Sequence, residues 1–297
     1  MENTAKETSD TGARSKRWAG LAVVATPIGN LADFTARAAA MLEEADVIAC
    51  EDTRTTAKLL RAHGIGSPLT PYHEHNAERA RPALLARLRR GERVALVSDA
   101  GTPLVSDPGY KLVRAAIAEG VPVTTAPGPS APLAALAVSG LPTDRFLFAG
   151  FLPPRAGRRR TALADLAALR ASLVFFESPR RLAASLADMA DVLGTREAAV
   201  CRELTKLHEE VRRGTLAELA AQYGAEDAPK GEVVIVVGPP PAAAETGEDE
   251  IDRLLDSPLE GESLRDAVDR VASVTGAPRK TVYARALARR EGAGDDS

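Results

Sequence analysis

The chain has 297 residues, of which 45% are apolar and 27% charged, and its formal net charge is -3 at pH 7. This length exceeds what one hydrophobic core usually serves, so we expect two domains. The net charge excludes a protein that coats nucleic acid by bulk electrostatics. Cys50 and Cys201 lie in apolar runs and are too few for a disulfide scaffold, which favours a cytoplasmic location and predicts no metal site.

Residues 1–17 are polar, with acidic and basic side chains mixed, and they predict a disordered tail without a secretion signal. The sequence contains no uncharged apolar run of about 18 residues, the length that a membrane-spanning helix needs. We therefore expect no association with a membrane.

Strand and helix patterns alternate from residue 18 to residue 128, which predicts an α/β domain with a mostly parallel sheet. The expected strands cover residues 20–26, 46–50, 69–72, 94–98 and 121–125. The expected helices cover residues 34–44, 56–63, 77–90 and 110–119, the first of them capped by Asp33.

Two loops that follow expected strands are rich in glycine and proline. Residues 98–103 contain Asp99 directly after a run of β-formers, and residues 126–131 contain Ser130 one strand later. Ligands of open α/β sheets bind at the carboxyl ends of the strands, so both loops are expected to line a binding crevice. Asp99 could instead cap a turn, and Ser130 could only start the following helix.

From residue 129 to residue 240 the pattern predicts a second, mixed α+β domain. Its expected strands cover residues 145–151, 172–177, 198–203 and 231–237, with a possible edge strand at 211–215. Its expected helices cover residues 130–139, 162–170, 179–192 and 216–223.

A Pro/Ala/Glu-rich linker at residues 241–250 leads to three short helical patterns in an appendage over residues 251–297. The last two patterns are joined by a turn with Gly276, as in a helix-turn-helix unit. A three-helix cap that contacts no nucleic acid fits this pattern equally well.

The common nucleotide signatures are missing, since the first strand is followed by neither a Gly-x-Gly-x-x-Gly turn nor a Walker lysine loop. Six other motifs occur in a fixed order: residues 26–31, 51–54, 98–103, 107–109, 126–131 and 176–181. Together they resemble the tetrapyrrole-methylase superfamily, and more narrowly the bacterial family that 2'-O-methylates a cytidine of small-subunit ribosomal RNA. The resemblance runs from about residue 21 to residue 239.

This resemblance implies a two-domain tetrapyrrole-methylase-like fold that binds S-adenosylmethionine in the cleft between its domains, in a homodimer. The substrate that it implies is 16S ribosomal RNA in the small ribosomal subunit. By analogy, the cofactor contacts fall on Pro27, Asp99, Ala100, Gly101, Thr102, Ser130, Ala131, Phe176, Leu204 and Gly231. The appended helices also resemble those of the RNA-methylating branch and are expected to contact RNA.

Methylation of a ribose hydroxyl needs in-line positioning and a proton acceptor. The candidates follow expected strands on the cleft side: Glu51, Asp52, Arg54, His73 and Glu74. Arg54 could hold a phosphate, and the other four could accept the proton, a choice that the sequence leaves open.

Basic residues are concentrated just after the turn at Pro154: Arg155, Arg158, Arg159 and Arg160. They predict a mobile loop that binds RNA phosphates, and a solvated surface without such contacts fits the cluster equally well.

Two other functions stay open on the sequence alone. A porphyrinoid or precorrin C-methyltransferase would share the cofactor motifs, but the arginine-rich stretch and the appended helices count against it. A non-catalytic S-adenosylmethionine-binding ribosome-assembly factor would keep Asp99 and Ser130 and would not need the cluster at residues 51–54.

Overall fold

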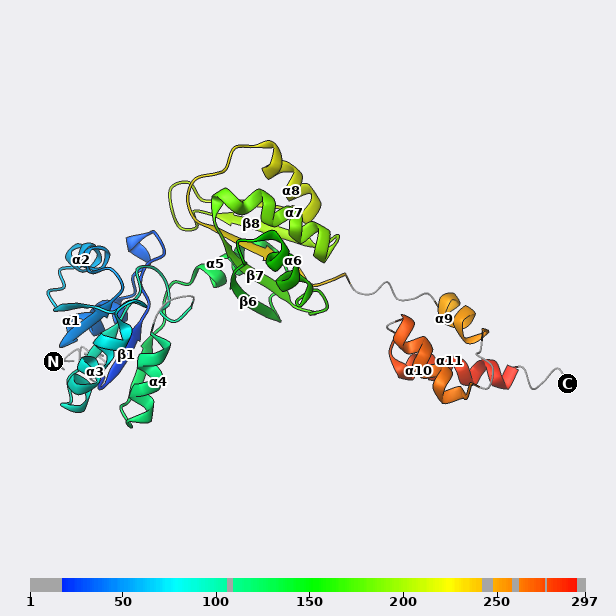
Figure 1. The fold of residues 1–297 in the computed structure, drawn as a ribbon, viewed down its shortest axis with the longest axis horizontal. Helices are drawn as coiled ribbons and strands as arrows, with labels where there is room; N and C mark the ends of the chain where they lie inside the picture. Colours follow the sequence, from blue (N-terminus) through cyan, green and yellow to red (C-terminus); the bar gives the residue numbers. More distant parts are fainter. Residues whose placement is uncertain (1–17, 106–108, 242–247, 258–261, 276, 293–297) are drawn as a thin grey trace, which may run out of the picture.

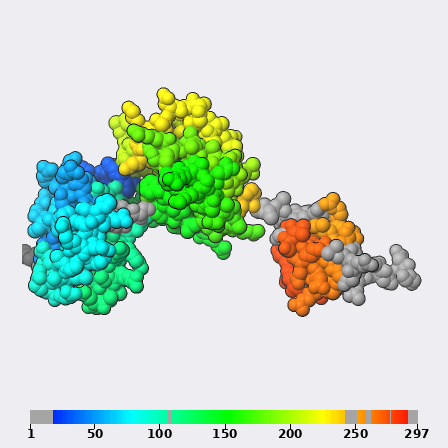
Figure 2. Space-filling model, viewed as in Figure 1, coloured from blue at the N-terminus to red at the C-terminus, as the bar shows by residue number. Residues whose placement is uncertain are grey.

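The computed structural model describes residues 18–105, 109–241, 248–257, 262–275 and 277–292. The predicted tail at residues 1–17, most of the linker, Gly276 and residues 293–297 lie outside them. Two α/β units and a group of short helices follow one another along the chain (Figure 1). Figure 2 shows the first unit in blue and cyan beside the second in green and yellow. We refer to them as the first domain and the second domain.

The sheet of the first domain has the strand order β3-β2-β4-β1-β5, and every pair is parallel, as predicted. Its strands are β1 (Leu21–Val24), β2 (Val47–Cys50), β3 (Leu69–Pro71), β4 (Val94–Leu96) and β5 (Val123–Ala126). Its helices are α1 (Ala36–Glu43), α2 (Thr53–Ala62), α3 (Ala77–Arg89) and α4 (Tyr110–Ala118).

The three central strands of this sheet, β1, β2 and β4, are buried along their whole length. Alternate side chains enter different cores: Ala22 and Val24 pack with α1, whereas Leu21 packs with α3 and α4. A sheet covered on both faces explains why these strands read as continuous apolar runs.

The first two helices begin at other residues than the sequence suggested. Phe34 has an extended backbone, so α1 is capped by Thr35, whose Oγ1 accepts a hydrogen bond from the Ala38 N–H at 3.1 Å; the predicted cap, Asp33, is wrong. Helix α2 starts at Thr53 because the Asp52 carboxylate accepts the Arg54 N–H at 2.8 Å.

The second sheet has the order β6-β7-β10-β8-β9 and is mixed, as predicted: β6 and β7 are parallel and the other pairs antiparallel. Its strands are β6 (Phe146–Phe151), β7 (Ser172–Glu177), β8 (Glu197–Arg202), β9 (Glu210–Thr215) and β10 (Val233–Val237). The edge position predicted for residues 211–215 is confirmed by β9.

Helices cover this sheet on both faces. They are α5 (Ala131–Ser139), α6 (Ala156–Ala164), α7 (Leu182–Leu193) and α8 (Leu216–Ala225). Phe175 and Ile235 face α6, α7 and α8, whereas their neighbours Val174 and Val236 face α5. Because successive side chains of a strand point to opposite faces of the sheet, they contribute alternately to two separate hydrophobic cores.

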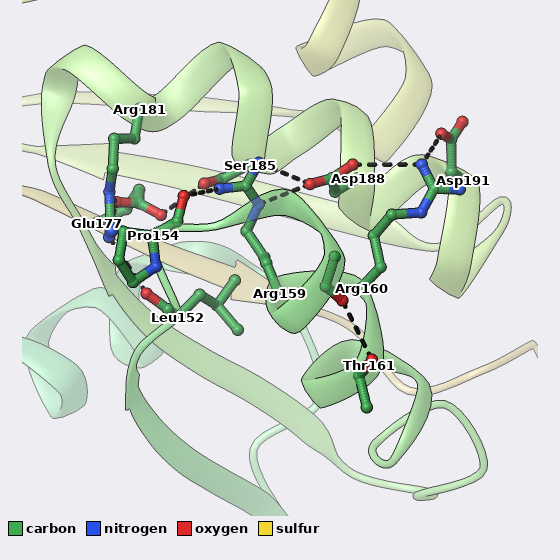
Figure 3. A network of polar contacts seen from close by, with 11 residues as sticks. Leu152, Pro154, Arg159, Arg160, Thr161, Glu177, Arg181, Ser185, Asp188 and Asp191 are labelled. Carbon is green, nitrogen blue, oxygen red and sulfur yellow. Dashed lines mark hydrogen bonds and ion pairs between the residues drawn. The ribbon is translucent and has the colours of Figure 1, made fainter.

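The arginine-rich stretch is helical, so the predicted mobile loop is wrong. It forms α6, and the Arg159 side chain is buried with its Nη2 2.6 Å from Asp188 Oδ2 on α7 (Figure 3). Arg160 Nη1 lies 2.9 Å from Asp191 Oδ2, one helical turn further on. These two acidic residues fix the helix in a position that local sequence could not indicate.

The C-terminal helices are α9 (Glu248–Leu255), α10 (Leu264–Thr275) and α11 (Arg279–Gly292). They enclose a small core that includes Ile251, Val268 and Val282. The predicted helical appendage is therefore confirmed, and its contact with RNA stays a prediction. None of the helices within the described ranges is long and apolar enough to cross a membrane.

Candidate active site

Three loops of the first domain are fastened to one another at the carboxyl edge of its sheet. Thr26 and Gly101 exchange backbone hydrogen bonds of 2.9 and 3.0 Å, and the Thr26 hydroxyl donates to the Ser98 carbonyl at 3.2 Å. The Thr102 hydroxyl donates to the Pro129 carbonyl at 3.1 Å. The loops after β1, β4 and β5 are therefore connected by hydrogen bonds and form one continuous surface.

Gly101 shows why this surface needs glycine. Its φ is 75°, in the left-handed region, and a Cβ atom there would lie 3.3 Å from Cγ2 of Ile28. The glycine lets the loop after β4 turn close against the loop after β1.

A cavity of ≈ 420 Å³ lies where these loops meet the second domain. This volume is typical of a cofactor site. From the first domain the cavity is lined by Ile28, Asp99, Ala100, Gly101, Thr102 and Val105. From the second domain it is lined by Ser130, Ala131, Pro132, Phe151, Phe176, Glu177, Ser178, Pro179, Gly231, Glu232, Val233 and Val234.

All the predicted cofactor contacts except Pro27 and Leu204 line this cavity. Pro27 lines a second, adjoining cavity, and Leu204 is buried between α5 and the second sheet. Phe151 and Glu232 were not predicted from the sequence, although Phe151 ends β6 after Gly150 and Glu232 lies between Gly231 and the start of β10. That position was the available signal for both residues.

The lining offers both polar and apolar contacts. Asp99 Oδ1 accepts the Asp52 N–H at 3.0 Å, and its Oδ2 makes no hydrogen bond with any residue that the structure describes. Ser130 precedes α5 without using its hydroxyl as a cap. Phe151 and Phe176 stack at a tilt with their ring centroids 5.3 Å apart. The site can therefore accept a ligand that has hydroxyl or ammonium donors and a flat apolar part.

The residue after Phe176, Glu177, has a buried carboxylate that stabilises this wall of the cavity. Glu177 accepts hydrogen bonds from the Ser178 N–H at 2.6 Å, the Arg181 guanidinium at 2.5 Å and the Ser185 hydroxyl at 2.6 Å. Figure 3 shows Glu177 between Arg181 and Ser185. This network fixes the turn at residues 178–179 that closes one side of the cavity.

The two acidic candidates before α2 differ in their acid–base chemistry. Hydrogen bonds from Arg54 lower the pKa of Asp52 to about 2, so Asp52 is a poor proton acceptor at neutral pH. Burial raises the pKa of Glu51, and the nearby Asp99 carboxylate raises it further. Glu51 therefore fits the role of a base better than Asp52 does.

None of the five catalytic candidates lines either cavity. The Arg54 side chain is 87% exposed and lies 2.7 Å from Asp52. The His73 ring centroid lies 6.1 Å from that of His75, and Glu74 is exposed. The structure thus brings Glu51 and Asp52 close to Asp99, and His73 lies near enough to Glu51 to influence the Glu51 carboxyl.

Comparison with known proteins tests what such a cleft is used for. The family of Tetrapyrrole (Corrin/Porphyrin) Methylases matches residues 20–220, and the RsmI C-terminal HTH domain matches residues 245–290. The Ribosomal RNA small subunit methyltransferase I of Mesorhizobium japonicum is 55% identical over 276 residues, covering 93% of this chain and 94% of that protein.

The chain belongs to the ribosomal RNA small subunit methyltransferase I family. A shorter relative is the Ribosomal RNA small subunit methyltransferase I of Thermotoga maritima, which is 45% identical over 217 residues. The matched residues cover 97% of that protein and 73% of this chain. This extent is close to that of the two α/β domains alone.

The fold of this methyltransferase family is shared with solved structures of low identity. The methyltransferase CobJ superposes with a TM-score of 0.56 at 21% identity, covering 75% of this chain and 95% of that one. The uroporphyrin-III C-methyl transferase of Thermus thermophilus, complexed with S-adenyl homocysteine, has a TM-score of 0.50 at 22% identity, covering 73% of this chain and 95% of that one. At these identities the likeness shows the fold alone.

Proposed function

We propose that this enzyme transfers the methyl group of S-adenosylmethionine to the ribose 2'-oxygen of a cytidine in 16S ribosomal RNA. The observation that carries the proposal is the 55% identity to a ribosomal RNA small subunit methyltransferase I over 93% of the chain. That match extends beyond the two α/β domains, which porphyrinoid enzymes of this fold also have.

The cofactor cavity supports the proposal on chemical grounds. Asp99 would accept hydrogen bonds from the hydroxyl or ammonium groups of S-adenosylmethionine, and Phe151 and Phe176 would contact its flat base. The backbone near Ala131, at the first turn of α5, offers N–H groups to a carboxylate. When bound, S-adenosylmethionine supplies an electrophilic methyl group.

The residues of the chain then have to orient the ribose and remove one proton. As the C–O bond forms and the C–S bond breaks, the hydroxyl proton must pass to a base. Glu51 is the carboxylate that we propose for this role, because its raised pKa suits a proton acceptor better than the low pKa of Asp52.

Two further parts of the proposal concern assembly. We propose a homodimer that acts in the cytoplasm on the small ribosomal subunit. Arg155 and Arg158 are exposed on α6 and keep their predicted role as RNA contacts, whereas the guanidinium of Arg159 is already bound to Asp188.

The test uses labelled S-adenosylmethionine and small subunits from a strain that lacks the modification. We expect label in 16S ribosomal RNA with the wild-type chain and much less with Asp99→Ala when S-adenosylmethionine is below saturation. Label on a porphyrinoid acceptor, or cofactor binding without transfer to any acceptor, would contradict the proposal in favour of the two other functions.

A further inference from the structure

A second cavity, of ≈ 270 Å³, adjoins the cofactor cavity. The two cavities share Ile28, Asp99, Ala100 and Glu232 in their linings. A ligand in one cavity would therefore lie beside a ligand in the other. The remaining walls of the second cavity come from the loop after β1, from α2 and from Lys206.

Lys206 lines this cavity, and ion pairs hold its side chain in place. Its Nζ lies 2.8 Å from Glu203 Oε1 and 2.8 Å from Glu232 Oε2. A Cβ atom on Gly29 would lie 2.4 Å from Lys206 Cε, so the lysine stem occupies the space that this glycine leaves open.

The backbone around Lys206 is strained in a way that supports a fixed position. Glu203 has a φ of 51° and Thr205 a φ of 67°, in the left-handed region that residues with a Cβ rarely adopt. Such conformations persist only where the surroundings hold them, and they are common at functional sites. Burial disfavours the ammonium, but the hydrogen bonds that it donates to Glu203 and Glu232 outweigh this effect and raise the pKa of Lys206. Lys206 therefore stays charged, and its charge is satisfied within the protein.

Lys58 is the other basic residue in the lining of the second cavity. It is exposed on α2 and forms no hydrogen bond or ion pair within the described part of the chain. Arg54 lies one helical turn earlier on the same helix and remains 87% exposed beside Asp52. Lys58 can therefore accept a phosphate group without breaking an ion pair of the described residues, whereas Arg54 is paired with Asp52.

We propose that the second cavity receives the acceptor nucleotide of the RNA and that Lys58 binds a phosphate group beside it. The inference rests on the proposed function, because a methyl acceptor has to lie next to the cofactor. A lysine binds RNA phosphate as a point charge, so its contribution falls with added salt.

The test compares Lys58→Ala, Lys58→Arg and the control Lys111→Ala, an exposed lysine on α4 of the same domain. Each variant is assayed for KM and kcat with unmodified small subunits at several salt concentrations, and for S-adenosylmethionine affinity by calorimetry. We expect Lys58→Ala to raise KM by roughly 10-fold and to reduce the salt slope of log KM by about 1. Its cofactor affinity should be unchanged, and Lys58→Arg and Lys111→Ala should behave as wild type.

A wild-type KM and salt slope in Lys58→Ala would overturn this inference alone. The same loss in Lys111→Ala would also overturn it, because the effect would then come from surface charge in general. A wild-type chain that methylates no subunit would overturn the proposed function itself, and that result does not depend on Lys58.

Discussion

Helices α2 and α6 are both basic in sequence, yet their charges have different environments. On α2, the Arg54 side chain is 87% exposed and Lys58 is unpaired among the described residues. On α6, the Arg159 side chain is 6% exposed and lies 2.6 Å from Asp188. The neighbouring helix α7 supplies acidic partners to α6, whereas Lys58 faces a cavity. The number of basic residues in a helix therefore does not identify an RNA-binding surface. What matters is whether acidic residues of the protein already pair with those side chains.

The largest expected effect is a loss of stability when a buried arginine of α6 is removed. Arg159→Ala should lower the free energy of unfolding by about 3 kcal/mol, because it leaves the buried Asp188 carboxylate with Arg160 as its one ion-pair partner among the described residues. Urea unfolding measures this loss. The control Arg158→Ala removes an exposed side chain of the same helix and should change stability by less than about 0.5 kcal/mol. Equal effects of the two variants would contradict the assignment of Arg159 as a structural residue.

Asp99→Ala should show the opposite behaviour in the first domain. Loss of a hydrogen bond to a charged carboxylate should weaken S-adenosylmethionine binding by roughly 10- to 100-fold. The folded structure should remain, because Asp99 is exposed and accepts a single hydrogen bond from the chain. Calorimetric titration measures the affinity, and unchanged binding would remove Asp99 from the cofactor site.

The two carboxylates before α2 should respond to pH with opposite signs. The pKa of Glu51 is raised in the folded state, so its charge costs stability once the pH exceeds the unfolded value of about 4.3. Glu51→Gln should therefore raise the melting temperature at neutral pH and lose this gain at about pH 4, while it lowers kcat.

The matched control is Asp52→Asn. Its pKa is lowered to about 2, so its charge stabilises the fold above the unfolded value of about 3.9 and loses this effect as the pH falls towards about 2. Asp52→Asn should lower the melting temperature at neutral pH. Melting curves across this pH range measure both signs, and equal signs would contradict the environments that we assign.

The smallest effect on the cofactor site should come from removing the appendage. A chain that ends at residue 241 keeps both sheets and the whole cofactor cavity. Its affinity for S-adenosylmethionine should equal that of the full chain, in line with the shorter relative from Thermotoga maritima. Its KM for small subunits should rise if the appended helices contact RNA. A large loss of cofactor affinity would show that the appendage supports the cleft.

Local signals explain what the sequence could predict. Glycine and proline end β4 and β5 near Asp99 and Ser130, and the loops that they mark do line the cavity. Apolar runs located nearly all the strands for the same reason, since burial on both faces is visible in composition. The predicted parallel sheet of the first domain and mixed sheet of the second were therefore confirmed.

Partners distant in sequence explain what could not be predicted. Arg159 and Asp188 are 29 residues apart, and only the packing of α6 on α7 shows that they pair. Lys206 meets Gly29 from the other domain, so the wall of the second cavity has no local signature. The candidate base also stayed open, because the pKa shifts of Glu51 and Asp52 depend on Asp99 and on hydrogen-bond geometry.

The most direct test of the proposed function is to determine which atom of the acceptor carries the transferred methyl group. Small subunits without the modification are methylated with labelled S-adenosylmethionine, and the labelled nucleoside is isolated from the digested 16S ribosomal RNA. We expect the label on the 2'-oxygen of a cytidine ribose, where the methyl group makes the adjacent phosphodiester bond resistant to alkali. Label on a base, or a linkage that alkali still cleaves, would contradict it.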